Sequence, residues 1–251
     1  MKTDITIIGY GTMGKAIAKA LSKSDKRIKI SIVDVDKKDL RNIKVSDFII
    51  LAVKPQDAKK MLAELKSYEI NKNTILISIM AGFSIKKIRQ FSLHKKIIRM
   101  MPNLGLSVGS GIAVWKANDL SSSEKKKAKN FINKITENFE VKNEDIINKV
   151  TAISGSGPAY FFLLASHLMK ASEALGFTKA ESRKLVEKTF SASAILSKDS
   201  DYSLLINKVA SKGGTTEAAL QVFKNKNLEK IVSKAVFSAY KKAKELTSIT
   251  N

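Results

Sequence analysis

The sequence has no cysteine and only two histidines. Without thiols, disulfide bonds, thiolate metal sites and nucleophilic cysteine chemistry are excluded. We expect His167, on an apolar helical stretch, to be packed in a core and His94 to lie in a loop, so no metal site is predicted. The first residues show no signal-peptide pattern, and no apolar run is long enough to cross a membrane. We therefore predict a cytoplasmic protein without a membrane partner.

Acidic residues are few, since 23 Asp and Glu face 45 Lys and Arg, for a formal net charge of +22. A basic surface attracts nucleic acids, anionic membranes and anionic small molecules. The lysines are nevertheless spread over predicted helices, and the densest run, Lys125 to Lys129, has no aromatic residues between its cations. We therefore expect a solvated lysine-rich surface and no nucleic acid partner.

A glycine-rich turn follows the first apolar stretch. Residues 5–8 are predicted to form a strand, and Gly9, Gly11 and Gly14 then occupy the glycine positions of a G-x-G-x-x-G pattern that opens a helix. In such a turn the first glycine makes the bend, the second admits a pyrophosphate and the third lets helix and strand pack closely. The pattern predicts a dinucleotide site, with an ordinary glycine turn as the alternative.

An acidic residue follows at the spacing that a dinucleotide site requires. Asp34 ends the predicted strand 27–33 and stands 34 − 14 = 20 residues after Gly14. A carboxylate there accepts hydrogen bonds from the adenosine ribose and repels a 2′-phosphate, whereas Lys37 and Lys38 favour that phosphate. The predicted cofactor is NADPH or NADH, with Asp34 favouring NADH, and a plain strand-ending turn is the alternative.

Strand and helix patterns alternate up to about residue 144, which predicts an α/β Rossmann domain with a mostly parallel sheet over residues 1–144. Only residues 35–47 separate the second strand from the next apolar strand at 48–53. This interval is too short for both a helix and a further strand. We therefore predict a sheet that is shortened around strand 3.

Residues 145–251 show helical periodicity without strand patterns and are predicted to form an all-α domain. A helical domain of about a hundred residues with so many apolar side chains can hardly bury all of them within one chain. We therefore expect it to mediate dimerisation, giving a homodimer and possibly a higher oligomer of dimers.

Two polar glycine turns open helices in this second domain. Residues 213–216 combine two glycines, whose backbone can wrap a carboxylate, with the hydroxyls of Thr215 and Thr216. The alternative is a glycine C-cap followed by a threonine N-cap. The turn at residues 154–160 is open to the same two interpretations.

Four motifs, taken together and in this order and spacing, resemble the pyrroline-5-carboxylate reductase family over nearly the whole chain. They are Ala52-Val53-Lys54-Pro55, Met101-Pro102-Asn103, Ser154-Gly155-Ser156-Gly157-Pro158-Ala159-Tyr160 and Gly213-Gly214-Thr215-Thr216. The resemblance implies a Rossmann domain, a helical dimerisation domain and reduction of 1-pyrroline-5-carboxylate to L-proline by hydride transfer from NAD(P)H, the last step of proline biosynthesis.

The resemblance also implies roles for individual residues. Thr216 is the expected catalytic residue, as the hydrogen-bond partner of the substrate nitrogen. The expected substrate-binding residues are Ser211, Gly213, Gly214, Thr215, Thr216 and Asp199. The expected cofactor-binding residues are Gly9, Gly11, Thr12, Met13, Gly14, Asp34, Ala52, Val53, Lys54, Pro55 and Asn103.

Three departures from the family pattern keep alternatives open. Leu104-Gly105 stands where the family has Thr-Pro, Lys212 replaces the proline before the double glycine, and the segment before the third predicted strand is abbreviated. A homologue with reduced activity or an altered substrate is therefore one alternative. The others are a related two-domain dehydrogenase or imine reductase for a different small acid, and a non-catalytic nucleotide-sensing or nucleic-acid-binding protein.

Overall fold

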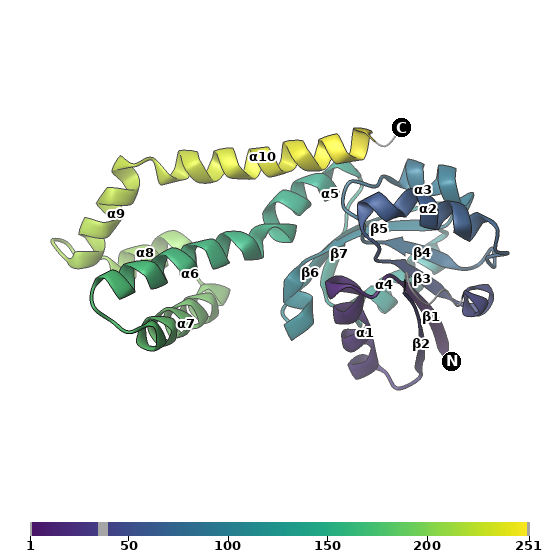
Figure 1. Ribbon diagram of the computed structural model, residues 1–251, viewed down its shortest axis with the longest axis horizontal. Helices are drawn as coiled ribbons and strands as arrows, with labels where there is room; N and C mark the ends of the chain where they lie inside the picture. The colour runs from purple at the N-terminus through teal and green to yellow at the C-terminus, as the bar shows by residue number, and fades with distance from the viewer. Residues whose placement is uncertain (1, 35–39, 250–251) are drawn as a thin grey trace. The chain divides into compact units, whose positions relative to one another are not determined.

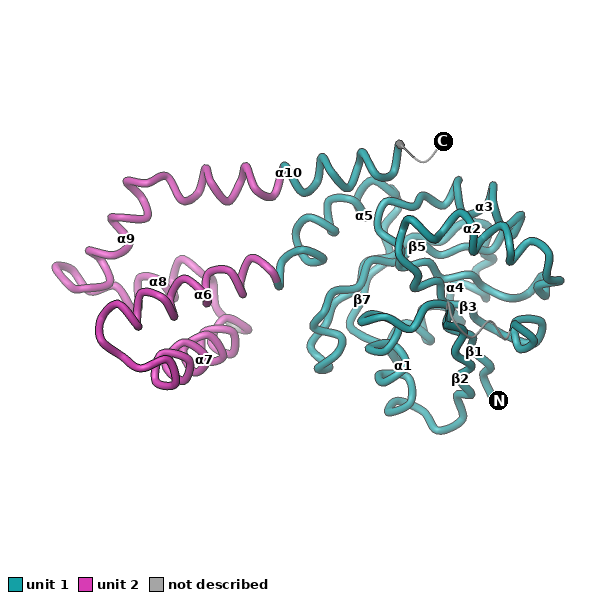
Figure 2. Tube along the Cα trace, viewed as in Figure 1, with its two compact units in different colours: residues 1–158, 238–251 teal, residues 159–237 magenta. Residues whose placement is uncertain are grey.

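The computed structural model describes residues 2–34 and 40–249, except for the side chains of Asp199 and Ile249 (Figure 1). The chain divides into two compact units (Figure 2). Unit 1 comprises residues 1–158 and 238–251, and unit 2 comprises residues 159–237. Unit 1 is therefore built from two separate stretches of the chain.

Unit 1 contains a seven-stranded sheet in the order β2-β1-β3-β4-β5-β6-β7. The strands are β1 (Thr3–Ile8), β2 (Ile28–Val33), β3 (Phe48–Leu51), β4 (Ile75–Ser78), β5 (Ile97–Pro102), β6 (Ile112–Asn118) and β7 (Glu137–Glu140). All neighbouring strands run parallel except β5 and β6, which are antiparallel. The predicted mostly parallel sheet is confirmed.

The sheet is short on the side of β2. Strand β3 pairs directly with β1, and β2 is the outermost strand among the described residues. Between β2 and β3 the described residues 40–47 hold a 3-10 turn, η1 (Arg41–Val45), and no strand. The predicted shortening around strand 3 is confirmed, while residues 35–39, including Lys37 and Lys38, lie outside the described part.

Helices cover both faces of the sheet (Figure 1). Helices α1 (Thr12–Ser24) and α4 (Ser122–Asn133) pack on one face, and α2 (Pro55–Lys66) and α3 (Ile85–Ser92) on the other. Neighbouring residues of one strand point to opposite faces of the sheet. Ile50 packs in the hydrophobic core on the side of α1 and α4, and Ile49 packs in the core on the side of α2 and α3. Strands buried on both faces must be apolar throughout, which explains the continuous apolar run at β3.

The rest of the described chain is helical. After the short turn η2 (Leu104–Val108), the later elements are α5 (Asp145–Val150), the π-helical turn η3 (Thr151–Gly155), α6 (Gly157–Ala174), α7 (Lys179–Leu196), η4 (Ser197–Asp199), α8 (Tyr202–Val209), α9 (Thr215–Asn225) and α10 (Leu228–Ile249). Thr178 and Glu181 form a capping box at the start of α7. The predicted all-α second part is confirmed.

Unit 2 buries very little surface within one chain. Ser182 is the single residue of the buried class among its described residues. On α6 the large side chains of Phe161, Phe162 and Leu163 are 58%, 57% and 59% exposed. The prediction that His167 is packed in a core is wrong for the single chain, because α6 lacks covering elements there and His167 is exposed. An apolar surface of this kind points to a partner.

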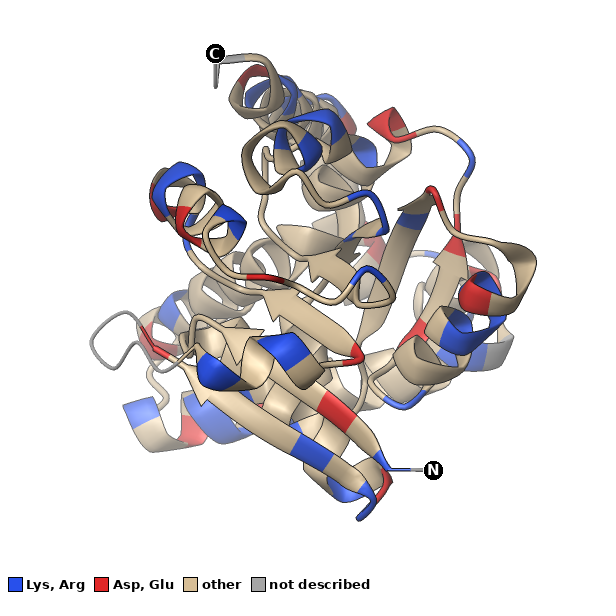
Figure 3. Ribbon diagram, turned by 90° about the vertical axis from the view of Figure 1, so that its right-hand side faces the viewer, with Lys and Arg blue, Asp and Glu red and all other residues tan. Residues whose placement is uncertain are grey.

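Basic residues are distributed over the molecule. Figure 3 shows Lys and Arg on many separate helices and strands, with acidic residues among them. Several acids are paired, for example Asp25 with Arg27 and Lys134, and Glu124 with Lys96. Among the residues that the structure describes, no helix has both the length and the apolarity to span a bilayer.

Candidate active site

The glycine turn after β1 is shaped by backbone contacts that only glycine permits. Gly9 has φ +96°, and a Cβ there would lie 2.7 Å from the carbonyl carbon of Ala52. A Cβ on Gly14 would lie 2.1 Å from the carbonyl oxygen of Gly9. These contacts agree with the roles expected of the first and third glycines, namely the bend and the close packing of helix on strand.

Gly11 differs from both neighbours, because nothing lies within 4 Å of a Cβ built there. It is the N-cap of α1, and no side chain caps the helix or places an acid in its first turn. Gly11 and Thr12 are exposed, and Met13 is half-buried against the core. The positive end of α1 is thus open to an anion, and the turn fits a dinucleotide pyrophosphate.

The other predicted cofactor residues of unit 1 follow the carboxyl ends of parallel strands. Asp34 is exposed directly after β2, and the N–H of Gly9 donates to the carbonyl of Val33 at 2.9 Å, so the two strand ends are joined. The carboxyl ends of parallel strands share one sheet edge, where ligands of open α/β sheets bind. The structure therefore brings Asp34 and the glycine turn to the same edge.

Residues 52–55 continue this edge after β3. The N–H of Ala52 donates to the carbonyl of Ile8 at 2.8 Å. Val53 is buried, whereas Lys54 is exposed and is the N-cap of α2, with Pro55 as the first helical residue. Proline at this position costs no hydrogen bond. The motif thus forms a fixed turn that presents the Lys54 side chain to solvent.

Asn103 follows β5 and closes the loop that contains η2. Its backbone N–H donates to the carbonyl of Ile112 at 3.2 Å, and its side-chain oxygen accepts from the N–H of Ile112 at 3.1 Å. Within the loop a Cβ on Gly105 would lie 2.6 Å from the carbonyl oxygen of Ser110. Leu104 is 37% exposed. The departure at 104–105 is thus part of a compact backbone turn that requires glycine.

The second glycine turn lies in unit 2, before α9. Gly213 has φ +72°, and the N–H of Gly214 donates to the carbonyl of Ser211 at 3.0 Å. A Cβ on Gly214 would lie 2.5 Å from the hydroxyl of Ser211. The double glycine therefore serves two needs, a left-handed backbone at the first position and room for the Ser211 side chain at the second.

Thr215 is the first residue of α9, and the N-cap is Gly214, which makes no side-chain cap hydrogen bond. The alternative of a threonine N-cap is therefore wrong. Thr215 is exposed and Thr216 half-buried. Because the first N–H groups of a helix have no partner inside it, this uncapped start keeps donors for an anion.

One residue of this turn was missed in the sequence. The N–H of Gly213 donates to the carboxylate of Glu217 at 2.7 Å. Glu217 stands three positions after the N-cap, which is the spacing of the acidic residue in a capping box, and that spacing could have revealed it. The chain thus places its own carboxylate on the turn proposed to bind one.

Two other predicted features remain. Residues 154–156 precede a long helix as predicted, since α6 begins at Gly157, but they end the π-helical turn η3, which continues from α5; the N–H of Ser156 donates to the carbonyl of Thr151 at 2.8 Å. Single π-helical turns occur frequently at functional sites. Asp199 lies in η4, and its role near the nicotinamide stays a prediction because its side chain lies outside the described part.

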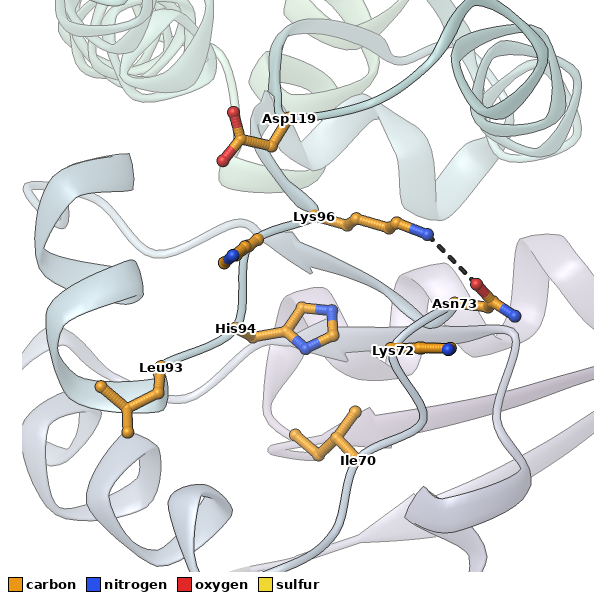
Figure 4. Close-up of a pocket in the computed structure, with 8 residues that line it drawn as sticks. Ile70, Lys72, Asn73, Leu93, His94, Lys96 and Asp119 are labelled. Atoms are coloured by element: carbon orange, nitrogen blue, oxygen red, sulfur yellow. Dashed lines mark hydrogen bonds between the residues drawn. The ribbon is translucent and has the colours of Figure 1, made fainter.

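A cavity of about 530 Å³ lies elsewhere in unit 1 (Figure 4). It is lined by residues of the turns before β4 and β5 and by Asp119, and it contains none of the predicted site residues. His94 lies in the second of these turns, as expected, and its Nε2 is 2.7 Å from the carbonyl oxygen of Thr74. Burial lowers the pKa of His94. The contact ties the two turns together at the amino ends of the strands.

Comparison with known proteins decides the family. The profile described as "Pyrroline-5-carboxylate reductase dimerisation" matches residues 144–246, and one described as "NADP oxidoreductase coenzyme F420-dependent" matches residues 33–82. The pyrroline-5-carboxylate reductase of Aquifex aeolicus is 32% identical, over 96% of this chain and 97% of its own. The chain belongs to the pyrroline-5-carboxylate reductase family.

Solved structures of pyrroline-5-carboxylate reductases agree with this assignment. The Plasmodium falciparum pyrroline carboxylate reductase with NADP bound has a TM-score of 0.88 at 29% identity and covers 98% of this chain and 99% of its own. The enzyme of Coxiella burnetii has a TM-score of 0.84 at 32% identity, with the same coverage. The resemblance inferred from the four motifs is confirmed.

Proposed function

We propose that the protein reduces 1-pyrroline-5-carboxylate to L-proline with a nicotinamide dinucleotide, the last step of proline biosynthesis. The observation that carries this proposal is the similarity to pyrroline-5-carboxylate reductases over almost the whole of both chains. Two glycine-based helix starts without a side-chain cap on the N-cap residue support it, since the reaction joins a cofactor with a pyrophosphate and a substrate with a carboxylate.

The cofactor-binding groups in this proposal come from unit 1. The first turn of α1, from Gly11 to Gly14, holds the pyrophosphate, and Asp34 accepts hydrogen bonds from the adenosine ribose. Residues 52–55 and Asn103 line the nicotinamide end. The dinucleotide, when bound, supplies the hydride. The residues of the chain hold the nicotinamide ring in place and leave one face of this ring open to the substrate.

The substrate-binding groups come from unit 2. The N–H groups of Gly213, Gly214 and the first turn of α9 hold the substrate carboxylate, with help from the Ser211 hydroxyl and from the positive end of the helix. In the structure the Glu217 carboxylate accepts a hydrogen bond from the N–H of Gly213, and this bond breaks when the substrate carboxylate binds. Lys212, beside the turn, adds favourable charge for an anionic substrate.

Thr216 is the proposed catalytic residue. Its hydroxyl forms a hydrogen bond with the imine nitrogen and thereby fixes the imine carbon toward the hydride donor. A strong acid is unnecessary when the substrate enters as the protonated iminium. Half-burial of Thr216 suits this role, because a partly desolvated hydroxyl has a restricted orientation.

For the assembly and the cofactor we propose a homodimer, which can associate further, and an NADH preference set by Asp34. The dimer is supported by the exposed apolar side chains of α6 and by the dimerisation profile over residues 144–246. The preference is supported by the position of Asp34 after β2, where a carboxylate repels a 2′-phosphate. The cytoplasm stays the compartment expected from the sequence.

The experiment is a spectrophotometric assay of NADH and NADPH oxidation with racemic pyrroline-5-carboxylate, together with a check that L-proline is formed. Oxidation should require both substrate and enzyme. Parallel assays with β-hydroxy acids and with a cyclic imine that lacks the carboxylate separate this function from the related dehydrogenases and imine reductases. Absence of proline formation with either cofactor would overturn the proposal.

A further inference from the structure

A lysine follows directly after the glycine turn of unit 1, in the first turn of α1. Lys15 is exposed, and its backbone N–H donates to the carbonyl of Gly11, the N-cap of the helix, at 2.9 Å. Residues four positions apart lie on the same face of a helix, and their side chains lean toward its N-terminus. Lys15 therefore shares the face of Gly11, and its side chain leans toward the glycine turn.

An aromatic ring holds the end of this side chain. Lys15 Nζ lies over the ring of Tyr10, 5.6 Å from the ring centroid. A cation at this distance is attracted by the negative face of the ring. Tyr10 is half-buried and packs against the hydrophobic core on the side of α1 and α4, so the position of its ring is fixed. Because Tyr10 precedes Gly11 in the chain, the ammonium group reaches back from the helix to the turn itself.

This place is unfavourable for a cation while no anion is bound. The N-terminus of a helix carries a positive partial charge, so acidic side chains stabilise it and basic ones destabilise it. The first turn of α1 has no acidic residue, and Lys15 forms no ion pair with another residue of the described ranges 2–34 and 40–249. The helix and the lysine thus add positive charge at one place without a carboxylate that balances it.

The other helices that cover the sheet start differently. Asp57 lies in the first turn of α2 and Glu124 in the first turn of α4. At the start of α3 the N–H of Ile85 donates to Glu144 Oε1 at 2.9 Å. Each of these three helix starts therefore has a carboxylate of the chain beside it, whereas α1 has a lysine.

The unbalanced charge at α1 matches the group that the proposed function places there. A Cβ on Gly11 would meet nothing within 4 Å, so the helix face that Gly11 shares with Lys15 is open at the turn. The pyrophosphate of a dinucleotide has a negative charge on each phosphate. Lysine binds phosphate oxygens as a point charge on a flexible stem.

We propose that Lys15 is a further cofactor-binding residue, which Tyr10 holds beside the glycine turn and which pairs with the pyrophosphate of the dinucleotide. The inference rests on the proposed function, in which the first turn of α1 binds this group. NADH and NADPH contain the same pyrophosphate. Lys15 therefore strengthens the binding of both alike, whereas Asp34 distinguishes them at the 2′-phosphate.

The test is a calorimetric titration of Lys15→Met and of the wild-type enzyme with NADH, NADPH and ADP-ribose. Methionine keeps a long side chain and a high helix propensity but removes the charge. In about 0.15 M salt each of the three dissociation constants should rise about tenfold, because a charge-assisted contact is lost. In about 1 M salt, where the Debye length is about 3 Å, the loss should shrink to about twofold. ADP-ribose lacks the nicotinamide, so an equal loss with this ligand locates the effect away from the nicotinamide ring.

Lys23→Met, in the last turn of α1, is the matched control for the loss of one positive charge. Lys23 lies eight residues, or roughly 12 Å, further along the helix, which exceeds the Debye length of about 8 Å in 0.15 M salt. Its three dissociation constants should equal those of the wild type.

Two variants of Tyr10 test the role of the ring. Tyr10→Leu removes the ring and should weaken the binding of all three ligands about threefold. Tyr10→Phe keeps the ring and should restore most of this loss. Equal affinities in the two variants would overturn the role of the ring.

Wild-type affinities in Lys15→Met, a loss confined to NADPH, or an equal loss in Lys23→Met would overturn the proposal. A lowered Tm in Lys15→Met with wild-type affinities would show that the contact with Tyr10 serves the helix alone, which also contradicts it. A wild-type protein that binds neither dinucleotide would overturn the proposed function together with this proposal. One that binds both but forms no proline would overturn the proposed function only.

Discussion

The backbone N–H of Gly213 donates to the side-chain carboxylate of Glu217 at 2.7 Å. The left-handed backbone of Gly213, with φ +72°, points this donor across the turn toward the first turn of α9. A carboxylate of the chain therefore occupies a donor that we assign to the substrate carboxylate. Binding of the substrate is expected to compete with this internal contact.

Replacing Glu217 with glutamine should strengthen substrate binding. The change removes a negative charge beside the incoming carboxylate and weakens the acceptor that holds the N–H of Gly213. We expect KM for pyrroline-5-carboxylate to fall about threefold, equivalent to about 0.7 kcal/mol, with kcat little changed. Glu229→Gln, in the first turn of α10, is the control for loss of one negative charge. A raised KM in Glu217→Gln would show that the carboxylate supports binding instead.

Thr216→Ala tests the proposed hydrogen bond to the substrate nitrogen. Loss of a hydroxyl that acts in the transition state should lower kcat/KM by about tenfold to a hundredfold. Tm should stay within a few degrees, because Thr216 is half-buried and does not cap α9. Thr216→Ser keeps the hydroxyl and should restore most of the activity. Equal rates in the alanine and wild-type enzymes would remove Thr216 from the mechanism.

The two glycines at the start of α1 should respond differently to alanine. A Cβ on Gly14 would lie 2.1 Å from the backbone of Gly9, so Gly14→Ala should lower Tm by many degrees and reduce soluble yield. A Cβ on Gly11 meets nothing within 4 Å, so Gly11→Ala should fold normally. It should nevertheless weaken NADH binding, because the methyl group occupies the space over the helix start. Calorimetry and a cofactor titration measure both effects, and unchanged cofactor affinity in Gly11→Ala would argue against a pyrophosphate there.

Asp34 should control the choice between the two cofactors. Asp34→Ser removes the charge that repels a 2′-phosphate and should shift the ratio of kcat/KM values about tenfold toward NADPH. Glu69→Gln is a suitable control, because Glu69 is 93% exposed and far along the chain from the glycine turn. The ratio should not move in this control. A ratio that also stays constant in Asp34→Ser would place the ribose contact elsewhere.

The ion pair of Glu124 predicts a pH dependence of stability. A hydrogen bond from Lys96 and bonds from Ser121 lower the pKa of Glu124 from 4.5 to about 2. A carboxyl group with a lowered folded-state pKa stabilises the protein above its unfolded-state pKa and loses this contribution as the pH falls through the folded-state value. The Tm difference between wild type and Glu124→Gln should therefore be largest above pH 5 and shrink toward pH 2. A difference that grows on acidification would contradict the assigned pairing.

The sequence predicted those features that depend on local pattern. Apolar strands, the cap at Thr178 and the glycines at Gly9 and Gly14 follow from side-chain period and backbone sterics, which act over a few residues. The shortened sheet was predictable as well, because chain length alone excludes a further helix and strand between β2 and β3.

The remaining features depend on contacts that local pattern does not encode. Residues 154–158 contain glycine and proline and so predicted an interruption; the regular helix is indeed interrupted, but the π-helical form of η3 was not predictable, and Pro158 is already the second residue of α6, where a missing N–H is tolerated. His167 lies on an apolar helix that has the pattern of a core helix, although a single chain leaves that helix exposed. Arg99 and Thr247 join through Asn148 across 148 residues of chain, which no short window of sequence reveals.

The two-part composition of unit 1 has a consequence for synthesis on the ribosome. Residues 238–251 complete unit 1, yet they are translated after all of unit 2. Domains generally fold in order as they emerge. The α10 residues Thr247, Tyr240 and Leu246 contact Asn148, Asp145 and Gly82 of the earlier part of unit 1. During translation these earlier residues therefore remain without their α10 contacts, and the polar and apolar groups around them stay exposed, while the intervening helices are made. The nascent sheet is thus expected to be vulnerable to proteases and dependent on chaperones until the last turns of α10 arrive.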